Sequence, residues 1–143
     1  GYIYKVTPDS FLQGTRCLKC ASSKGEIAIS EYLRNKNIRF MFEYKFDDCK
    51  NKRPLPFDFY LPDYNICIEY DGEQHYRPID YFGGKKRFKY IQQNDNIKNQ
   101  YCKGNNIPLL RIPYWEFDNI EEILDKWLSK YELIHNENIK NVV

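Results

Sequence analysis

The hydrophobic pattern of the chain is clearest in two short alternating runs, at residues 57–61 and 66–71, separated by a polar turn. Alternation with a period of two is typical of β-strands, because successive side chains point to opposite faces. If Asp63 and Tyr64 are the centre of the turn, or if the loop has four residues, the runs pair as an antiparallel hairpin. The expected apolar faces are Phe57, Phe59 and Leu61 in the first run and Ile66, Ile68 and Tyr70 in the second.

The polar face of this hairpin carries three carboxylates. The register sets Asp58 opposite Glu69, with Cβ atoms about 5 Å apart, and Asp71 lies about 7 Å further along the same face. Like charges at such a separation destabilise a sheet, whereas Mg²⁺ is usually held by one or two carboxylates with water and phosphate. The pattern predicts a divalent metal site here. The alternative is an ordinary solvated acidic face.

Further elements are predicted on both sides of the hairpin from periodicity and capping signals. They are a helix opened by Ser23-x-x-Glu26 and ended at 35–37, a strand at 38–48, a helix at 87–103, a strand at 107–113 and a helix opened by Asp118-x-x-Glu121. The apolar strand at 107–113 is expected to run parallel to a neighbour. The order α-β-β-β-α-β-α predicts an α/β sandwich with a central mixed four-stranded sheet flanked by helices.

The strand at 38–48 is expected to alternate as well, with its aromatic residues on one face. These residues are Phe40, Phe42, Tyr44 and Phe46. In the helix at 87–103, one stripe at helical spacing contains two charged residues, Asp95 and Lys98, among apolar ones. Charges inside such a stripe are anomalous for a helix that only packs. A simple i,i+3 ion pair between them is the alternative explanation.

The composition fits one globular domain over residues 23–134, because 143 residues with 42% hydrophobic and 17% aromatic residues can build a core. Residues 81–86 are expected to be a flexible basic loop and residues 135–143 a polar, frayed tail. No run of 18 apolar residues or signal-peptide pattern occurs, so no membrane partner is expected. The net charge of +2 is weak evidence for nucleic acid, but basic residues flank the acidic hairpin.

The five cysteines are an odd number without a secretion signal, which indicates a reducing compartment. Cys49, Cys67 and Cys102 are expected to be small buried residues. The pair Cys17-x-x-Cys20 in residues 1–22 resembles a zinc knuckle. Structural Zn²⁺ is expected there only if a second ligand pair lies upstream in a longer protein; the alternatives are a linker or a β-turn with incidental cysteines.

The stretches PFDFYLP and IEYDGEQHY resemble the PD-(D/E)XK, or restriction-endonuclease-like, nuclease superfamily, and most closely the branch of very-short-patch-repair and phage homing endonucleases. The resemblance covers about residues 24–114. It implies that Asp58 and Glu69 bind Mg²⁺ or Mn²⁺, with Glu26 as a further ligand unless it only caps its helix. Asp71 departs from the motif, because it stands where the superfamily has a lysine.

Another residue must then supply the missing positive charge. Some superfamily members carry this lysine on the following helix, so Lys98 is the first candidate, with Gln74 and His75 as rivals. The acids around His75 should raise its pKa, which suits a general acid or a phosphate contact.

The resemblance implies an intracellular, phage- or virus-encoded endonuclease that hydrolyses double-stranded DNA, with a homodimer as a plausible assembly. Phosphate contacts are expected from two basic segments, which contain Lys52, Arg53, Lys85, Lys86, Arg87 and Lys89. The rival hypothesis is a non-catalytic DNA-binding module that keeps the fold. A weaker third one is an RNA-binding or interaction domain.

Overall fold

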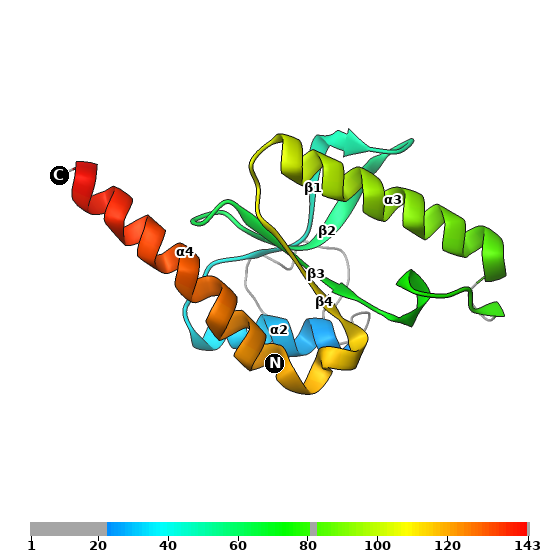
Figure 1. The fold of residues 1–143 in the computed structure, drawn as a ribbon, viewed down its shortest axis with the longest axis horizontal. Coiled ribbons are helices and arrows are strands. Elements are labelled where there is room, and N and C mark those ends of the chain that lie inside the picture. The colour runs from blue at the N-terminus through cyan, green and yellow to red at the C-terminus, as the bar shows by residue number, and fades with distance from the viewer. Residues whose placement is uncertain (1–22, 81–82, 143) are drawn as a thin grey trace.

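The computed structural model describes residues 23–80 and 83–142, with side chains through residue 131. Its elements in chain order are α2 (Lys24–Asn35), β1 (Met41–Lys50), β2 (Pro54–Leu61), β3 (Ile66–Asp71), the 3₁₀ turn η2 (Glu73–His75), α3 (Gly84–Gly104), β4 (Leu109–Pro113), the 3₁₀ segment η4 (Tyr114–Asn119) and α4 (Ile120–Val142). Among these residues the order of helices and strands is the predicted one, and the fold is α/β (Figure 1).

The sheet has the order β1-β2-β3-β4 and is mixed. The first three strands are antiparallel neighbours, whereas β4 runs parallel to β3 after the crossover through α3. The β2–β3 register pairs Phe59 with Ile68 and Leu61 with Ile66, as the sequence predicted. The turn has four residues, and Asn65 takes the left-handed backbone conformation with φ 57°. The parallel pairing of β4 is also confirmed.

Helices cover both faces of the sheet (Figure 1). α2 and α4 lie on one face and pack on an apolar cluster that includes Phe59, Ile68 and Ile112, all fully buried. α3 lies on the other face. It covers a smaller cluster of Cys49, Phe57, Cys67, Cys102 and Ile107. The three cysteines are free and buried, as expected.

The apolar faces of β1 and β2 switch sides in mid-strand, which the sequence analysis did not predict. Phe59 packs towards α2 and α4, but Phe57 belongs to the cluster under α3. On β1, Phe42 and Phe46 divide in the same way, so strict alternation was wrong for both strands. Between these residues Glu43 has φ 54°, a left-handed conformation that changes the direction of the following side chains. The switch leaves Asp58 between two aromatic residues that face opposite layers.

The capping box of α2 is confirmed: the Ser23 hydroxyl accepts from the Glu26 N–H, and the Glu26 carboxylate accepts from the Ser23 N–H. Gly25, in the first turn, lies against the ring of Tyr70 from β3. A methyl group at this position would overlap the ring carbons of Tyr70. Glycine therefore allows the N-terminus of α2 to approach β3 next to the carboxylates.

We expect Gly25→Ala to lower the free energy of unfolding by about 1–3 kcal/mol, because the added methyl group overpacks the contact with Tyr70. Urea denaturation followed by circular dichroism measures the change. Gly104→Ala is the matched control, since a methyl group there meets no atom within 4 Å among the described residues. Equal stability of Gly25→Ala and wild type would show that this contact is not tight.

Several boundaries differ from the predictions. The strand expected at 38–48 is Met41–Lys50, β2 begins at Pro54 and β4 begins at Leu109. α3 begins at Gly84, so Lys85 and Lys86 lie in its first turn and not in a flexible loop. α4 begins at Ile120 after η4, so Asp118 does not cap it. α4 also continues to Val142, which makes the expected polar tail helical.

The cysteine pair Cys17 and Cys20, with its possible zinc site, lies outside the described residues. Within residues 23–80 and 83–142, none of the helices combines the length and the apolar character that a membrane span requires.

Candidate functional site

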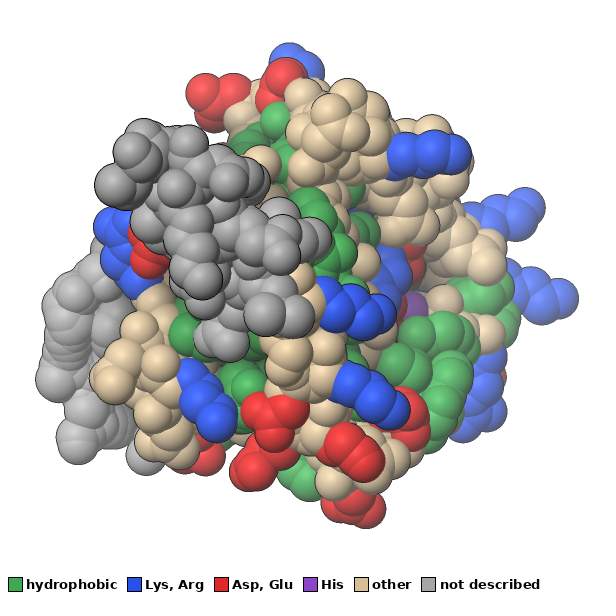
Figure 2. All heavy atoms as spheres, turned by 60° about the vertical axis from the view of Figure 1, so that its left-hand side comes forward, with side chains coloured by type: hydrophobic (Ala, Val, Ile, Leu, Met, Phe, Trp, Pro, Cys, Tyr) green, Lys and Arg blue, Asp and Glu red, His purple; other side chains and the backbone are tan. Residues whose placement is uncertain are grey.

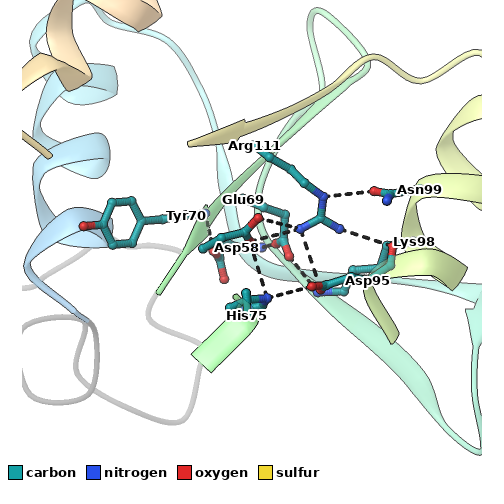
Figure 3. A network of polar contacts seen from close by, with 9 residues as sticks. Asp58, Glu69, Tyr70, His75, Asp95, Lys98, Asn99 and Arg111 are labelled. Atoms are coloured by element: carbon teal, nitrogen blue, oxygen red, sulfur yellow. Dashed lines mark hydrogen bonds and ion pairs between the residues drawn. The ribbon is translucent and has the colours of Figure 1, made fainter. Parts of the chain in front are cut away.

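Asp58 of β2 and Glu69 of β3 interlock where their strands begin to separate. The Asp58 N–H donates to Glu69 Oε2 at 2.5 Å, and the Tyr70 N–H donates to Asp58 Oδ2 at 2.8 Å. Each carboxylate thus fixes the backbone of the other strand. Figure 3 shows the two side chains together between the sheet and α3, while the Tyr70 ring points towards α2. The predicted meeting of these two acids across the hairpin is present.

Burial raises the pKa of the Asp58 carboxyl well above its usual range, and the negative charges of Glu69 and Glu26 raise it further. The hydrogen bond from Tyr70 and the positive charge of Lys98 act in the opposite direction but do not compensate. The ionised form of Asp58 is therefore destabilised unless an additional positive charge is bound. Glu69 itself is 2% exposed.

Lys98 projects from α3 into this pair. Its Nζ donates to Glu69 Oε1 at 2.7 Å and lies 5.3 Å from the centre of the Phe57 ring. Burial lowers the pKa of Lys98, but the charge of Glu69 and their hydrogen bond outweigh it, so the net shift is upward and the ammonium form persists at neutral pH. The i,i+3 ion pair between Asp95 and Lys98, the alternative explanation for their place in the helix, is not among the described contacts. Lys98 instead contacts Glu69 of β3, and Asp95 contacts His75 of η2 and Arg111 of β4.

Asp71, which was predicted to face a metal ion, instead forms an ion pair with Arg111. Arg111 of β4 donates through Nη1 to both Asp71 oxygens at 3.0 Å. The guanidinium is itself anchored from α3, because its Nε donates to Asn99 Oδ1 at 2.9 Å and its Nη2 to the Asp95 carbonyl at 3.3 Å. Arg111 thus neutralises Asp71. It makes Asp71 a weaker candidate for a metal ligand than Asp58 or Glu69.

His75, in η2, faces the same network (Figure 3). Its Nδ1 lies 2.8 Å from Asp95 Oδ2 and 3.7 Å from Asp71 Oδ1. Burial lowers the pKa of His75, but the hydrogen bond with Asp95 and the charges of Asp71 and Asp95 raise it more, so the net shift is upward. With Nδ1 held by Asp95, Nε2 is the ring nitrogen available to a substrate.

We expect the pKa of His75 to lie above the ordinary value of 6.5 and to fall in Asp95→Asn, because the charged partner of Nδ1 is lost. An NMR titration of the histidine ring protons measures both values. The second histidine of the sequence, His135, is an internal reference that the substitution should not move. A His75 pKa at or below 6.5 in the wild type would contradict the geometry.

Of the two roles that the sequence left open for Glu26, the capping role is confirmed. Glu26 completes the capping box with Ser23, and its charge contributes to the raised pKa of Asp58 and of Tyr70. It is therefore close enough to the carboxylate pair to act on it electrostatically. A direct ligand role for Glu26 stays a prediction.

The expected DNA-contacting residues lie near two parts of α3. Lys52 and Arg53 are exposed in the β1–β2 turn, which Asn51 joins to α3 through a 3.0 Å hydrogen bond to Asn94. The other group, which lies in the first turns of α3 and is also exposed, consists of Lys85, Lys86, Arg87 and Lys89. On the face drawn in Figure 2, basic side chains are dispersed and do not form one continuous patch.

The role of Arg111 was not predicted, because residues 107–113 were expected only as a buried apolar strand. A lone arginine inside such a run was a usable signal, because an arginine in a buried strand requires an acidic partner. The parallel register pairs Glu69 with Arg111 on adjacent strands, which brings the guanidinium to the acidic face. This register depends on the sheet topology, and the sequence alone did not specify it.

The residues present fit a divalent cation of the Mg²⁺ type. Among the described residues, no group of three or more His, Cys, Asp and Glu side chains forms a metal cluster. Mg²⁺ does not require one, since one or two carboxylates together with water and phosphate are its usual ligands. Glu69 Oε1 accepts from Lys98, and Glu69 Oε2 accepts from the Asp58 N–H. Each carboxylate oxygen has a second lone pair, which could coordinate a cation.

Comparison with known proteins finds relatives in viruses. The chain is 34% identical over 119 residues to "Uncharacterized protein 033L" of Invertebrate iridescent virus 3, a match that covers 79% of this chain and 60% of that one. It is 38% identical over 61 residues to "Uncharacterized protein 307L" of Invertebrate iridescent virus 6, covering 42% of this chain and 31% of that one. It is 35% identical over 78 residues to "Uncharacterized protein 094L" of Frog virus 3, covering 53% and 50%.

The chain therefore spans between about a third and three fifths of the length of these curated relatives. No protein-family model and no solved structure matches it. The viral source of all three relatives fits the expectation that the chain is virus-encoded.

Proposed function

We propose that this chain is a metal-dependent endonuclease that hydrolyses phosphodiester bonds of double-stranded DNA. One observation carries the proposal: Asp58 and Glu69 meet across neighbouring strands, and the ammonium group of Lys98 contacts Glu69 at 2.7 Å. Two carboxylates that can hold a cation, next to a fixed positive charge, are what the hydrolysis of a phosphodiester needs. The order of elements and the mixed sheet support a restriction-endonuclease-like fold as part of this proposal.

Asp58 and Glu69 would hold Mg²⁺ or Mn²⁺. The raised pKa of Asp58 supports this assignment, because a bound cation would offset the repulsion between the two carboxylates. When bound, such an ion polarises the phosphate and lowers the pKa of water.

The chain's own residues supply the remaining chemistry. Lys98, held in the ammonium form by Glu69, would neutralise charge that develops on the scissile phosphate or orient the attacking water. It thereby replaces the lysine that the superfamily motif places at Asp71. His75, oriented by Asp95, would present Nε2 as a proton donor or phosphate contact.

The DNA backbone would be held by the exposed basic residues at the β1–β2 turn and at the start of α3. Their contacts with phosphate contribute affinity but no sequence information. We expect the protein to act inside the infected cell, where such DNA is present. A double-strand cut from one active site per chain would require a homodimer.

A plasmid cleavage assay tests the proposal. The wild-type chain should nick or linearise supercoiled DNA with Mg²⁺ or Mn²⁺ and should be inactive with EDTA. Cleavage that continues in EDTA would contradict a metal-dependent reaction. DNA binding without cleavage under any divalent cation would favour the non-catalytic DNA-binding module instead, for which the ion pair of Asp71 with Arg111 is the supporting observation.

A further inference from the structure

Three aromatic side chains form an exposed cluster beside the candidate site, which we call the aromatic platform: Tyr76, Tyr114 and Trp115. They are 41%, 37% and 59% exposed. Their rings are nevertheless in mutual contact, with centroids 4.7 Å apart for Tyr76 and Trp115 and 5.4 Å apart for Tyr114 and Trp115. Most aromatic residues of the described chain are buried in the core clusters or packed against them, so a contiguous exposed group is a candidate for a binding surface.

Sheet topology places the aromatic platform at the ends of β3 and β4, next to Asp71. β3 and β4 are parallel and Asp71 pairs with Pro113, so the segments that follow the two strands leave the same edge of the sheet. Tyr76 follows η2 after β3, and Tyr114 directly follows β4. The Tyr70 hydroxyl donates to the Tyr114 carbonyl at 3.4 Å, which joins β3 to the segment after β4, and the rings of Tyr76 and Tyr114 have centroids 6.1 Å apart.

The neighbourhood of Tyr76 confirms this closeness to the polar network. Burial of its hydroxyl and the negative charge of Asp71 raise the pKa of Tyr76 to about 12. The phenol is therefore neutral at physiological pH, and the platform presents uncharged ring faces beside the site.

We propose that the aromatic platform stacks an unpaired nucleobase, so that the preferred substrate is DNA with a single-stranded stretch beside the cut. This inference rests on the proposed nuclease function and specifies its substrate. In an intact duplex each base is already stacked on its neighbours and presents only its edges, whereas an unpaired base can offer its face to a ring. Aromatic stacking of this kind is tolerant of sequence, since every base has such a face.

The test uses the full chain with Asp58→Asn, which allows binding to be measured without cleavage. Fluorescence anisotropy compares a labelled duplex with the same duplex carrying a three-nucleotide single-stranded gap. We expect the gapped DNA to bind at least about tenfold more tightly. Adding Trp115→Leu should remove that preference and leave duplex affinity within about twofold, because phosphate contacts are unaffected.

Tyr90→Leu is the matched control, since Tyr90 is 44% exposed on α3 and is not part of the aromatic platform. It should leave the ratio of the two affinities unchanged. Equal binding of gapped and intact DNA, or an equal loss for both in Trp115→Leu, would overturn the inference. Tighter binding of an RNA version of the gapped strand would also overturn it.

The inference and the proposed function can fail separately. If the wild type cleaves DNA in a metal-dependent way but Trp115→Leu does not change the preference for gapped DNA, only the inference about the aromatic platform is overturned. A preference for gapped DNA that depends on Trp115, in a chain that never cleaves, would overturn the nuclease function and keep the platform as a binding surface.

Discussion

Asp58→Asn is expected to lower the rate of metal-dependent DNA cleavage by at least about a hundredfold. Asparagine keeps the size of the side chain and an oxygen that can accept the Tyr70 N–H, but it removes the charge that would hold the cation together with Glu69. Glu69→Gln should cause a loss of similar size. Single-turnover cleavage of a labelled duplex in Mg²⁺ measures both.

The matched control is Asp63→Asn, an exposed aspartate in the β2–β3 turn that pairs only with exposed Arg39 among the described residues. It should cleave at the wild-type rate. Wild-type cleavage by Asp58→Asn would remove this residue from the mechanism. A loss in all three variants would indicate that the hairpin charge acts on DNA binding in general.

The stability of Asp58→Asn separates a lost function from a lost fold. The pKa of Asp58 is raised in the folded state, so its protonated form is favoured there. The contribution of the Asp58 carboxyl to the free energy of unfolding is complete below pH 3.8, its pKa in the unfolded chain. It is lost as the pH rises through the higher pKa of the folded state. At neutral pH without metal, Asp58→Asn should therefore be at least as stable as the wild type, and adding Mn²⁺ should stabilise only the wild type.

Lys98→Met is expected to destabilise the protein by about 3–5 kcal/mol at neutral pH. The substitution removes the cation that contacts Glu69, and Glu69 is then a buried charge without its lysine partner. Methionine preserves most of the side-chain volume, so the effect reports the charge. Urea denaturation measures it, and cleavage activity should fall in parallel.

The double variant Lys98→Met with Glu69→Gln should recover most of that stability, since no unpaired charge then remains at the pair. Lys103→Met, at the exposed end of α3, is the matched control and should change stability by less than about 0.5 kcal/mol. A cost below about 1 kcal/mol for Lys98→Met would mean that Glu69 does not depend on the Lys98 ammonium group. The proposed role of Lys98 would then be wrong.

The hairpin at the centre of the site was predictable because its information is local. The four-residue turn fixes which residues of β2 and β3 oppose each other, and Asp58 and Glu69 follow directly from that register. The capping box of α2 and the parallel placement of β4 were predictable for similar reasons. Each depends on a short motif or on the hydrophobic pattern of one segment.

The rest of the network depends on tertiary packing that no local pattern encodes. Glu43 takes a left-handed conformation within β1, and on the neighbouring strand Phe57 lies in the layer under α3, where Lys98 Nζ is 5.3 Å from the centre of its ring. The partners of Asp95 are His75 and Arg111, which arrive from two other elements. Periodicity marked Asp95 and Lys98 as anomalous, but only the position of α3 over the sheet decides what each one contacts.

The most direct test of the carboxylate pair as a cation site is a crystal of the chain grown or soaked with Mn²⁺, with X-ray data collected at the manganese absorption edge. The anomalous difference map should contain a peak within coordination distance of both Asp58 and Glu69, at about 2.0–2.3 Å from their oxygens. The peak should be absent in Asp58→Asn crystals treated in the same way. A peak bound instead by Asp71, His75 and Asp95, or no peak at saturating Mn²⁺, would contradict the assignment.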